Sequence, residues 1–491
     1  MIQFAGTIVF IIGILVLFAL DRDKEARTSK ALWIPVVWLF LAGSRPVSYW
    51  LHIRMIGNSA DDLLEGSPLD RAVITVLIAL ALIVLFARGQ KVATVLRANV
   101  PILLFLCYCG ASLFWSDFPD VGFKRYVRAI GDFAMILVVL TDLQPSIAFE
   151  RVLARAGFII FPLSVLFEIG RGYSGLGYHA GVATDKNMFG MISLVLGLAA
   201  IWRFQRLVRD EEHQHRARRL FARGTIALIA IWCIWTAKSA TSTASFLVGI
   251  VLITMARRRA PARKAVLLHA LVVSAVFLAL YASILNPDVG IASAMGKDPT
   301  LTGRTDVWKT VIGMAPSPLF GAGFESFWLG PRLKKLWGIF VWSPNEAHNG
   351  YIELYLNLGW LGLGLLAFIL ITGYWRVLSR LRLYPDTGNL AFTYFVVAII
   401  YSLTEAGFRM FSLVWIAFLM SISAVFEPEP RNAASPGAIA VPKTSPRVEL
   451  RQRKAASSVT ESMVGRKQRA RNNERQHQNI LRNIESASDV V

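Results

Sequence analysis

The sequence has 491 residues, of which 55% (about 270) are hydrophobic and only 17% are charged, and its mean hydropathy is +0.51. A bilayer core about 30 Å thick needs about 20 apolar residues per helix, so this composition suffices for about thirteen spans and excludes a soluble enzyme, a coiled coil and a disordered chain. The 52 Lys and Arg exceed the 32 Asp and Glu by 20. In a polytopic membrane protein this excess is typical of positive cytoplasmic loops and does not indicate nucleic acid as a partner.

Thirteen apolar runs follow one another along the chain. They cover residues 2–20, 31–50, 72–87, 99–115, 129–145, 152–170, 187–203, 224–237, 242–256, 265–285, 352–375, 389–405 and 409–426. Ser44, Arg45 and Pro46 interrupt the second run, which leaves open whether it crosses the membrane or re-enters. The first run has no basic region before it and no small-residue cleavage site, so we expect it to be a retained span. The sequence therefore predicts an all-α polytopic membrane protein with about 12–13 transmembrane helices.

The loops between the runs alternate in charge. The basic set comprises residues 22–30, 88–97, 203–223, 257–264 and 376–382. By the positive-inside rule these loops lie in the cytoplasm, which places the N-terminus outside and the C-terminus inside. We expect residues 1–426 to form the transmembrane domain, with one large extracytoplasmic loop over 286–350, between the tenth and eleventh runs. Residues 427–491 have too few large apolar side chains for a core, so a disordered basic cytoplasmic tail is expected.

Several basic residues lie on the predicted outer side, against the usual bias. They are Lys124, Arg125, Arg171, Lys186, Lys238 and Arg304. Ionisable groups near a membrane are unfavourable unless they are paired or functional. Brought together by the bundle, these side chains would bind an anion, and a lipid diphosphate fits because Arg binds phosphate oxygens through a planar fork and Lys as a point charge. For Lys124 and Arg125, simple solvation at a helix start is the alternative.

His348 lies near the end of the large loop, between Glu346 and Asn349. With an unperturbed pKa near 6.5 an imidazole can be neutral near pH 7, as a general base requires, and the two neighbours can orient its ring. A packed loop histidine is the alternative. Three tryptophans of the loop can stack on sugar rings or anchor the loop at the membrane interface: Trp328, Trp337 and Trp342. No paired-carboxylate metal site accompanies the basic residues, so we expect no metal and no cofactor.

The same segments carry a resemblance to a known family. Its motifs are Gly303–Trp308, Pro318–Gly323, His348–Glu353 and Gly359–Gly364, accompanied by Trp115–Asp117, Lys124 and Arg125, Lys186 and Asn187, and Thr404 and Glu405. In this order and on one membrane face they resemble the superfamily of O-antigen ligases and Wzy-type polysaccharide polymerases, and within it the exopolysaccharide polymerases of the ExoQ type. The resemblance covers nearly all of residues 70–426.

The resemblance implies a metal-independent, inverting glycosyltransferase at the outer, periplasmic face of the bacterial inner membrane. The donor would be a saccharide on undecaprenyl diphosphate, the acceptor another glycan, and a chain-length regulator and export proteins would be further partners. Carried over, Arg304 and Lys238 would bind the diphosphate, and His348 would activate the acceptor hydroxyl. Glu346, which can orient the ring of His348, is a further catalytic candidate. The supporting residues would be Asp306, Trp308, Asn349, Tyr351, Glu353 and Glu405. The chain departs from the family at Lys238, where ligases often have arginine, and at Asp185, where ExoQ-like chains commonly have histidine.

Polymerisation of lipid-linked repeat units into exopolysaccharide is thus the leading hypothesis. An O-antigen ligase, which would move a finished glycan onto the lipid A core, is the alternative in the same class and differs in its acceptor. A flippase for lipid-linked oligosaccharides is the alternative from another class. The large polar outer loop argues against it, because a flippase is expected to place its charges in a central cavity between two halves.

Overall fold

The computed structural model describes residues 2–22, 27–53, 67–171, 178–209, 216–255 and 304–423. The predicted span 265–285, loop residues 286–303 and the chain beyond 423 lie outside these ranges. The chain divides into two parts between Glu427 and Pro428. All described residues belong to the first part, and the predicted disordered tail stays a prediction.

Every regular element among the described residues is a helix. They are α1 (Ile2–Leu20), η1 (Lys30–Leu32), α2 (Trp33–Ala42), α3 (Val47–Trp50), α5 (Pro68–Ala87), α6 (Gly89–Ala98), α7 (Val100–Ala111), η2 (Ser112–Trp115), α8 (Pro119–Leu140), α9 (Pro145–Arg171), α10 (Lys186–Arg209), α11 (Arg216–Thr236), α12 (Ala240–Met255), α15 (Arg304–Gly313), α16 (Gly330–Ile339), α17 (Gly350–Leu383), α18 (Pro385–Tyr401) and α19 (Leu413–Ile422). Each predicted apolar run that falls within the described ranges coincides with one or more of them. The second run is broken between α2 and α3, at the interruption seen in the sequence.

The helices include several that are long and apolar enough to cross a bilayer. Within the described ranges five qualify, namely Pro68–Ala87, Pro145–Ile169, Lys186–Arg209, Arg216–Thr236 and Gly350–Leu383, and a sixth is obtained if α6 and the α7–η2 segment, bent by 87°, are one span. Four shorter apolar helices, Phe10–Leu20, Lys30–Ala42, Ala240–Met255 and Leu413–Ile422, accompany them. The predicted all-α polytopic membrane protein is confirmed, whereas the exact number of crossings stays a prediction.

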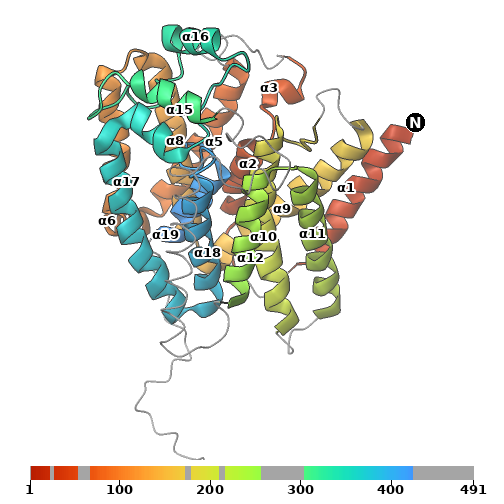
Figure 1. Ribbon diagram of the computed structural model, residues 1–491. Coiled ribbons are helices and arrows are strands. Elements are labelled where there is room, and N and C mark those ends of the chain that lie inside the picture. Colours follow the sequence, from red (N-terminus) through yellow and green to blue (C-terminus); the bar gives the residue numbers. More distant parts are fainter. Residues whose placement is uncertain are drawn as a thin grey trace, which may run out of the picture. The chain divides into compact units, whose positions relative to one another are not determined.

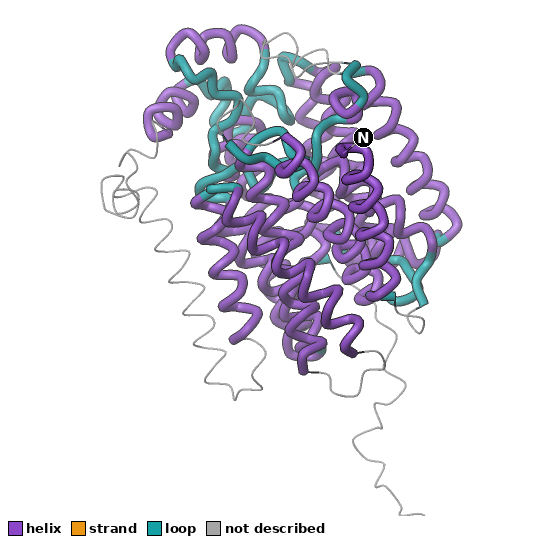
Figure 2. The backbone as a smooth tube through the Cα atoms, turned by 90° about the vertical axis from the view of Figure 1, so that its right-hand side faces the viewer, coloured by secondary structure: helices purple, strands orange, loops and turns teal. Residues whose placement is uncertain are grey.

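The helices pack lengthwise around one apolar core. In Figure 1, α17, α18 and α19 lie on the left and centre, α12, α10 and α11 follow towards the right, and α1 lies at the right edge. Large side chains such as Trp202, Phe161, Phe189 and Phe392 are buried between them. Figure 2 shows that the loops gather mostly at the upper end, the end at which α15 and α16 lie in Figure 1.

The lower end of the bundle carries the arginines of the loops with the predicted cytoplasmic charge. Asp21, just after α1, accepts from Arg203 of α10 at 2.8 Å and from Arg223 of α11 at 2.8 Å. Glu150 of α9 contacts Arg203 at 2.9 Å and Arg206 at 3.0 Å. Arg203 and Arg223 are mostly buried, and because each has a carboxylate partner, neither leaves an unpaired buried charge. The basic loops thus also fasten α1, α9, α10 and α11 to one another.

Residues 304–349 form a cap at the upper end of the bundle, with a small apolar core of its own (Figure 1). Val311 of α15 and Leu333 and Leu336 of α16 are fully buried in it, together with Phe327 from the connecting loop. Trp308 and Ala347 complete this core next to the start of α17. The described part of the predicted large loop is therefore a folded unit, whereas its extracytoplasmic location stays a prediction.

A break in α17 fastens the cap to the bundle. Gly359 has φ 63° and ψ −163°, values that a residue with a side chain rarely adopts. The interrupted turn receives the motif Pro318–Gly323: the N–H of Trp360 donates to the carbonyl of Pro318 at 2.9 Å, and the N–H of Ala322 donates to Leu356 at 2.9 Å. A Cβ on Gly359 would lie 2.3 Å from the carbonyl carbon of Leu319, so glycine is required there. At this position the motif Gly359–Gly364 is thus a docking point for the backbone of residues 318–322.

Candidate active site

His348 lies in the turn that leads into α17, and its backbone is unusual. Its φ of 50° falls in the left-handed region, which is uncommon for a residue with a side chain and is maintained only by strong surrounding contacts. Asn349 supplies them: its Oδ1 accepts from the N–H groups of Tyr351 and Ile352, capping α17, and its Nδ2 donates to Leu403 at 2.9 Å. The N–H of Gly350 donates to Ser402 at 2.7 Å. The histidine is therefore held against the segment between α18 and α19.

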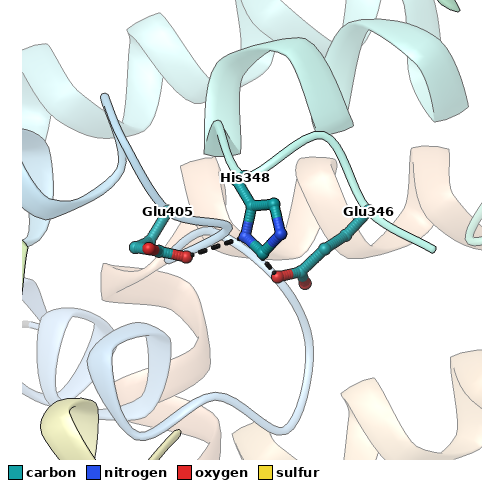
Figure 3. A group of neighbouring side chains, drawn as sticks. All are labelled: Glu346, His348 and Glu405. Carbon is teal, nitrogen blue, oxygen red and sulfur yellow. Dashed lines mark hydrogen bonds and ion pairs between the residues drawn. The ribbon is translucent and has the colours of Figure 1, made fainter. Parts of the chain in front are cut away.

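Two carboxylates flank the imidazole of His348. Nδ1 lies 2.9 Å from Oε1 of Glu346 and 3.0 Å from Oε2 of Glu405 (Figure 3). Glu346 comes from the cap and Glu405 from the segment after α18, so the site is assembled from both. Since both carboxylates contact the same nitrogen, Nδ1 carries the proton that they share, and Nε2 is the nitrogen directed away from them.

Each carboxylate also has an arginine partner. Glu405 pairs with Arg304, the first residue of α15, at 3.1 Å, and Arg304 also donates to the carbonyl of Thr404. Glu346 pairs with Arg409 at 3.4 Å. Arg409 in turn lies 3.0 Å from Oε2 of Glu325, in the cap. Positive and negative groups thus alternate in one charged cluster, which comprises Arg304, Glu405, His348, Glu346, Arg409 and Glu325.

The charged cluster favours the protonated imidazole. Burial by itself would lower the pKa of His348, but hydrogen bonds and charge from Glu346 and Glu405 outweigh it and raise the pKa to about 9. Burial would likewise raise the pKa of Glu346, yet His348, Arg409 and Arg304 lower it to about 2. The neighbouring Glu325 raises the pKa of Arg409 above its usual value, against the effect of burial. The sequence led us to expect an imidazole that is neutral near pH 7, whereas in this resting arrangement it is an imidazolium.

Buried residues around Ala347 hold His348 in position. The N–H of Ala347 donates to the carboxylate of Glu353, which also accepts from Nε1 of Trp328 at 2.8 Å. The carbonyl of Ala347 accepts from Nε1 of Trp308 at 2.6 Å. Tyr351, in the first turn of α17, donates from its hydroxyl to Ile399 at 3.3 Å. Trp308 and Glu353 therefore fix the backbone on one side of His348 and Asn349 fixes it on the other, while the supporting role expected of these residues stays a prediction.

The segment that carries Glu405 and Arg409 is anchored in the bundle. The fully buried carboxylate of Asp132, on α8, accepts from the N–H of Phe411 at 2.7 Å and from Nε1 of Trp38 at 2.8 Å. The guanidinium of Arg128 lies over the ring of Phe411, 5.1 Å from its centroid. A buried carboxylate of this kind is unfavourable unless it has partners, and here it fixes the position of Phe411, shortly after Arg409 in the chain.

The remaining predicted diphosphate ligands lie at the same end of the bundle with different surroundings. Arg125 is partly buried and donates to the carbonyl of Glu325. Lys238 is exposed in the turn between α11 and α12, with φ 49°, and the nearby Thr241 contacts the hydroxyl of Thr404 at 2.9 Å. Lys124 and Lys186 are also exposed. Through Thr241, the turn that carries Lys238 contacts Thr404, whose carbonyl accepts from Arg304.

Other sequence candidates have local or undetermined roles. Asp185 caps α10: its Oδ1 accepts from the N–H groups of Asn187 and Met188 at 2.9 and 3.0 Å. Asp306 is exposed on the first turn of α15. Arg171 is the last residue of α9, and its side chain lies outside the described residues.

Sequence reasoning assigned no role to Glu325 and Arg409. The signal that could have found them was the charge balance: with several cations predicted on one face, the acidic residues of that face must be among their partners. Which acid meets which arginine depends on packing between distant segments, since Arg409 and Glu325 are 84 residues apart.

Three groups of the charged cluster have the chemistry of a metal site. Nδ1 of His348 and one oxygen each of Glu346 and Glu405 lie within 4.8 Å of one another. Imidazole and carboxylate are ligands that transition metals accept. The same atoms, however, hydrogen-bond to one another, and both carboxylates contact arginines. A metal ion would have to replace these contacts, so the geometry favours an ion-pair network.

The fold and site together define a polytopic helical membrane protein with a histidine–carboxylate–arginine cluster at the cap. The family model described as O-antigen ligase matches residues 224–369, which include Lys238, Arg304 and His348. The chain is also 27% identical, over 304 residues, to the exopolysaccharide production protein ExoQ of Rhizobium meliloti (strain 1021). That match covers 57% of this chain and 65% of the relative, just under two thirds of its length. Both findings support the O-antigen ligase and Wzy-type polymerase superfamily, and the ExoQ-like resemblance is confirmed.

Proposed function

We propose that this protein is a glycosyltransferase that polymerises undecaprenyl-diphosphate-linked oligosaccharide units into exopolysaccharide at the outer face of the bacterial inner membrane. The observation that carries the proposal is the position of His348: a histidine fixed through Nδ1 by Glu346 and Glu405, in the same cluster as Arg304. Fixing one ring nitrogen through a carboxylate leaves the other to exchange a proton with a substrate, which is the arrangement of a general base.

The proposed reaction is a single displacement. An acceptor hydroxyl attacks the anomeric carbon of the donor saccharide, the new glycosidic C–O bond forms, and the bond from that carbon to the diphosphate oxygen breaks. The hydroxyl proton passes to Nε2 of neutral His348, and the leaving group departs as undecaprenyl diphosphate. Attack opposite the leaving group inverts the anomeric configuration. No metal takes part in this scheme.

Cations near the leaving group would stabilise the charge that develops on the diphosphate. Arg304 is suited to bidentate phosphate binding but is already paired with Glu405, so it would share its guanidinium between the two. The exposed ammonium groups of Lys238, Lys186 and Lys124 are accessible to the substrate and would bind it as point charges. In this proposal the lysines attract the diphosphate, and Arg304 positions it relative to His348.

An O-antigen ligase is the second proposal, favoured by the description of the family model that matches residues 224–369. It uses the same donor chemistry and differs in its acceptor, the lipid A core. A flippase receives no support from the charged cluster, whose ion pairs join the cap to the segment between α18 and α19. For both enzymatic proposals the cap would face the periplasm and the arginine-rich lower end the cytoplasm.

Deletion of the gene, with separate analysis of secreted polymer and lipopolysaccharide, tests the proposal. Loss of high-molecular-weight polymer with intact lipopolysaccharide supports the polymerase, and loss of O-antigen from lipid A supports the ligase. Accumulation of lipid-linked units on the cytoplasmic face would favour the flippase. Complementation with His348→Ala and Arg304→Ala should restore neither product while both proteins remain in the membrane. Normal polymer from either variant would contradict the site assignment.

A further inference from the structure

The end of α16 presents two large apolar residues to the outside in a tight turn. The N–H of Ser343 donates to the carbonyl of Phe340 at 3.0 Å, which puts Val341 and Trp342 at the two central positions of the turn. Such positions usually hold Gly, Pro, Asn, Asp or Ser. Here Val341 is 99% exposed and Trp342 is 47% exposed. The rest of the described protein leaves these large apolar side chains uncovered, so this turn offers apolar surface to a ligand.

Trp342 lies beside the catalytic histidine. Its ring is nearly parallel to that of His348, with centroids 6.3 Å apart and an interplanar angle of 27°. The turn is also fixed at its far side, because Nε1 of Trp337 donates to the carbonyl of Pro344 at 2.9 Å. The indole is therefore a rigid, half-exposed apolar surface next to a histidine whose Nε2 is directed away from the two carboxylates.

The three tryptophans of the cap differ in their exposure and in their position relative to His348. Trp328 is only 4% exposed and donates to Glu353, and Trp337 is partly buried and donates to Pro344. Both are used in holding the cap together. Trp342 alone of the three combines exposure with a position beside His348. Its surroundings fit the recognition of a substrate, whereas those of the other two fit structure.

We propose that Trp342 is the stacking platform for the acceptor saccharide, an assignment that rests on the proposed function. The C–H face of a pyranose is apolar and packs on an indole, while its ring hydroxyls remain directed sideways. A sugar ring on the exposed part of Trp342 would lie at the edge of the His348 imidazole, with one hydroxyl facing Nε2. Trp342 thus selects the ring that is to be extended and orients its hydroxyl, and the cations bind the donor.

Transfer kinetics with the purified full-length chain in nanodiscs test this assignment. The donor is the polyprenyl-diphosphate-linked repeat unit of the source organism, held at saturation, and the lipid-free glycan of the same unit is titrated as acceptor. Trp342→Ala should raise the acceptor KM about tenfold, the loss of one aromatic contact, with a smaller change in kcat. Trp342→Phe, which keeps a flat ring, should recover most of the affinity. An unchanged acceptor KM in Trp342→Ala would overturn the proposal.

Val341→Ala is the matched control, because Val341 shares the turn and its exposure but has no ring to stack. If the turn merely anchors the cap in the membrane interface, Val341→Ala should impair transfer as Trp342→Ala does, and that result would also overturn the proposal. Binding of the lipid-free glycan to wild type and Trp342→Ala, measured without donor, tests the stacking platform separately from the transfer activity. Binding that depends on Trp342 without any transfer would support the platform and contradict the glycosyltransferase, and absence of both would contradict both.

Discussion

The protonation of His348 is decided by the groups on its Nδ1 side. Glu346 and Glu405 stabilise the imidazolium and raise the pKa of His348 to about 9. A general base must be neutral when the acceptor arrives, so at neutral pH only a minor fraction of the resting enzyme has the required form. In the proposed mechanism the carboxylates therefore orient the base and, in the same contact, reduce the fraction of it that can accept a proton.

This residue makes the pH dependence of the reaction predictable. Because the neutral fraction increases about tenfold per pH unit below the pKa, kcat/KM should rise with that slope between about pH 6 and 8 and level off near 9. Initial rates of transfer across this range, in purified protein checked for integrity at each pH, provide the measurement. A flat profile between pH 6 and 9 would argue that His348 is not the base.

Glu405→Gln provides the internal check on that profile. It removes one negative charge next to Nδ1, so the imidazolium loses part of its stabilisation and the pKa of His348 should fall by roughly 1–2 units. The rise in kcat/KM should then be complete at a lower pH, although the maximal rate also decreases because Arg304 loses its partner. A profile that keeps its wild-type position would contradict the role of Glu405.

The same residues predict the response to chelators. If Glu346, His348 and Glu405 form an ion-pair network with Arg304 and Arg409, purified enzyme treated with EDTA should keep its transfer activity, and added Zn²⁺ or Mn²⁺ should not stimulate it. Loss of activity in EDTA with recovery on adding one of these ions would instead assign a metal to the three ligands.

At the scale of elements, the break in α17 determines where the cap lies. Backbone of residues 318–322 occupies the interrupted turn at Gly359, where Leu356 receives the N–H of Ala322, and His348 stands just before the first residue of the same helix. The position of the cap and the orientation of His348 therefore both depend on α17. A rigid element of this type is a better support for a catalytic group than a free loop.

Gly359→Ala tests the break. The methyl group would meet the backbone of Leu319 at 2.3 Å, and the backbone conformation itself disfavours any side chain by roughly 1–3 kcal/mol. We expect a lower unfolding temperature of the purified protein and loss of polymer. Gly364→Ala is the control: it lies in the same helix with nothing within 4 Å of the added Cβ, so its unfolding temperature should be unchanged or higher. Equal behaviour of the two variants would contradict a special role for Gly359.

At the scale of the whole bundle, the charges divide between two ends. The lower end has its arginines paired by Asp21 and Glu150, whereas the upper end gathers the charged cluster and the exposed lysines. Because they are paired, these lower arginines hold helices together in addition to providing the positive-inside signal of the sequence. In the proposed orientation the upper cations lie on the outer side of the membrane, where basic residues are disfavoured.

This division predicts the accessibility of single cysteines. In a variant without the natural cysteines, Val341→Cys in the cap should react with a membrane-impermeant maleimide in intact spheroplasts, because Val341 is 99% exposed. Lys91→Cys, at the exposed start of α6, should react only after permeabilisation. Reaction of both before permeabilisation, or the reverse pattern, would contradict the proposed orientation.

The sequence alone was sufficient for the class of fold. Apolar runs of span length predict helices because a buried backbone must satisfy its hydrogen bonds locally, and the runs within the described ranges are helices. It also singled out His348, Arg304 and Glu405, since charged residues next to a membrane are conspicuous against an apolar background.

Only the tertiary structure decided which groups act together. Nothing in the local sequence indicates that Glu405 and Glu346 share Nδ1 of His348, that Arg409 joins Glu346 to Glu325, or that Trp342, among three cap tryptophans, lies beside the imidazole. These contacts join the cap to the segment between α18 and α19, and their distances follow from how α17 breaks and where its N-terminus docks. The pKa of His348 followed from them too, because a pKa depends on the charges within a few ångströms, and those come from residues far apart in the chain.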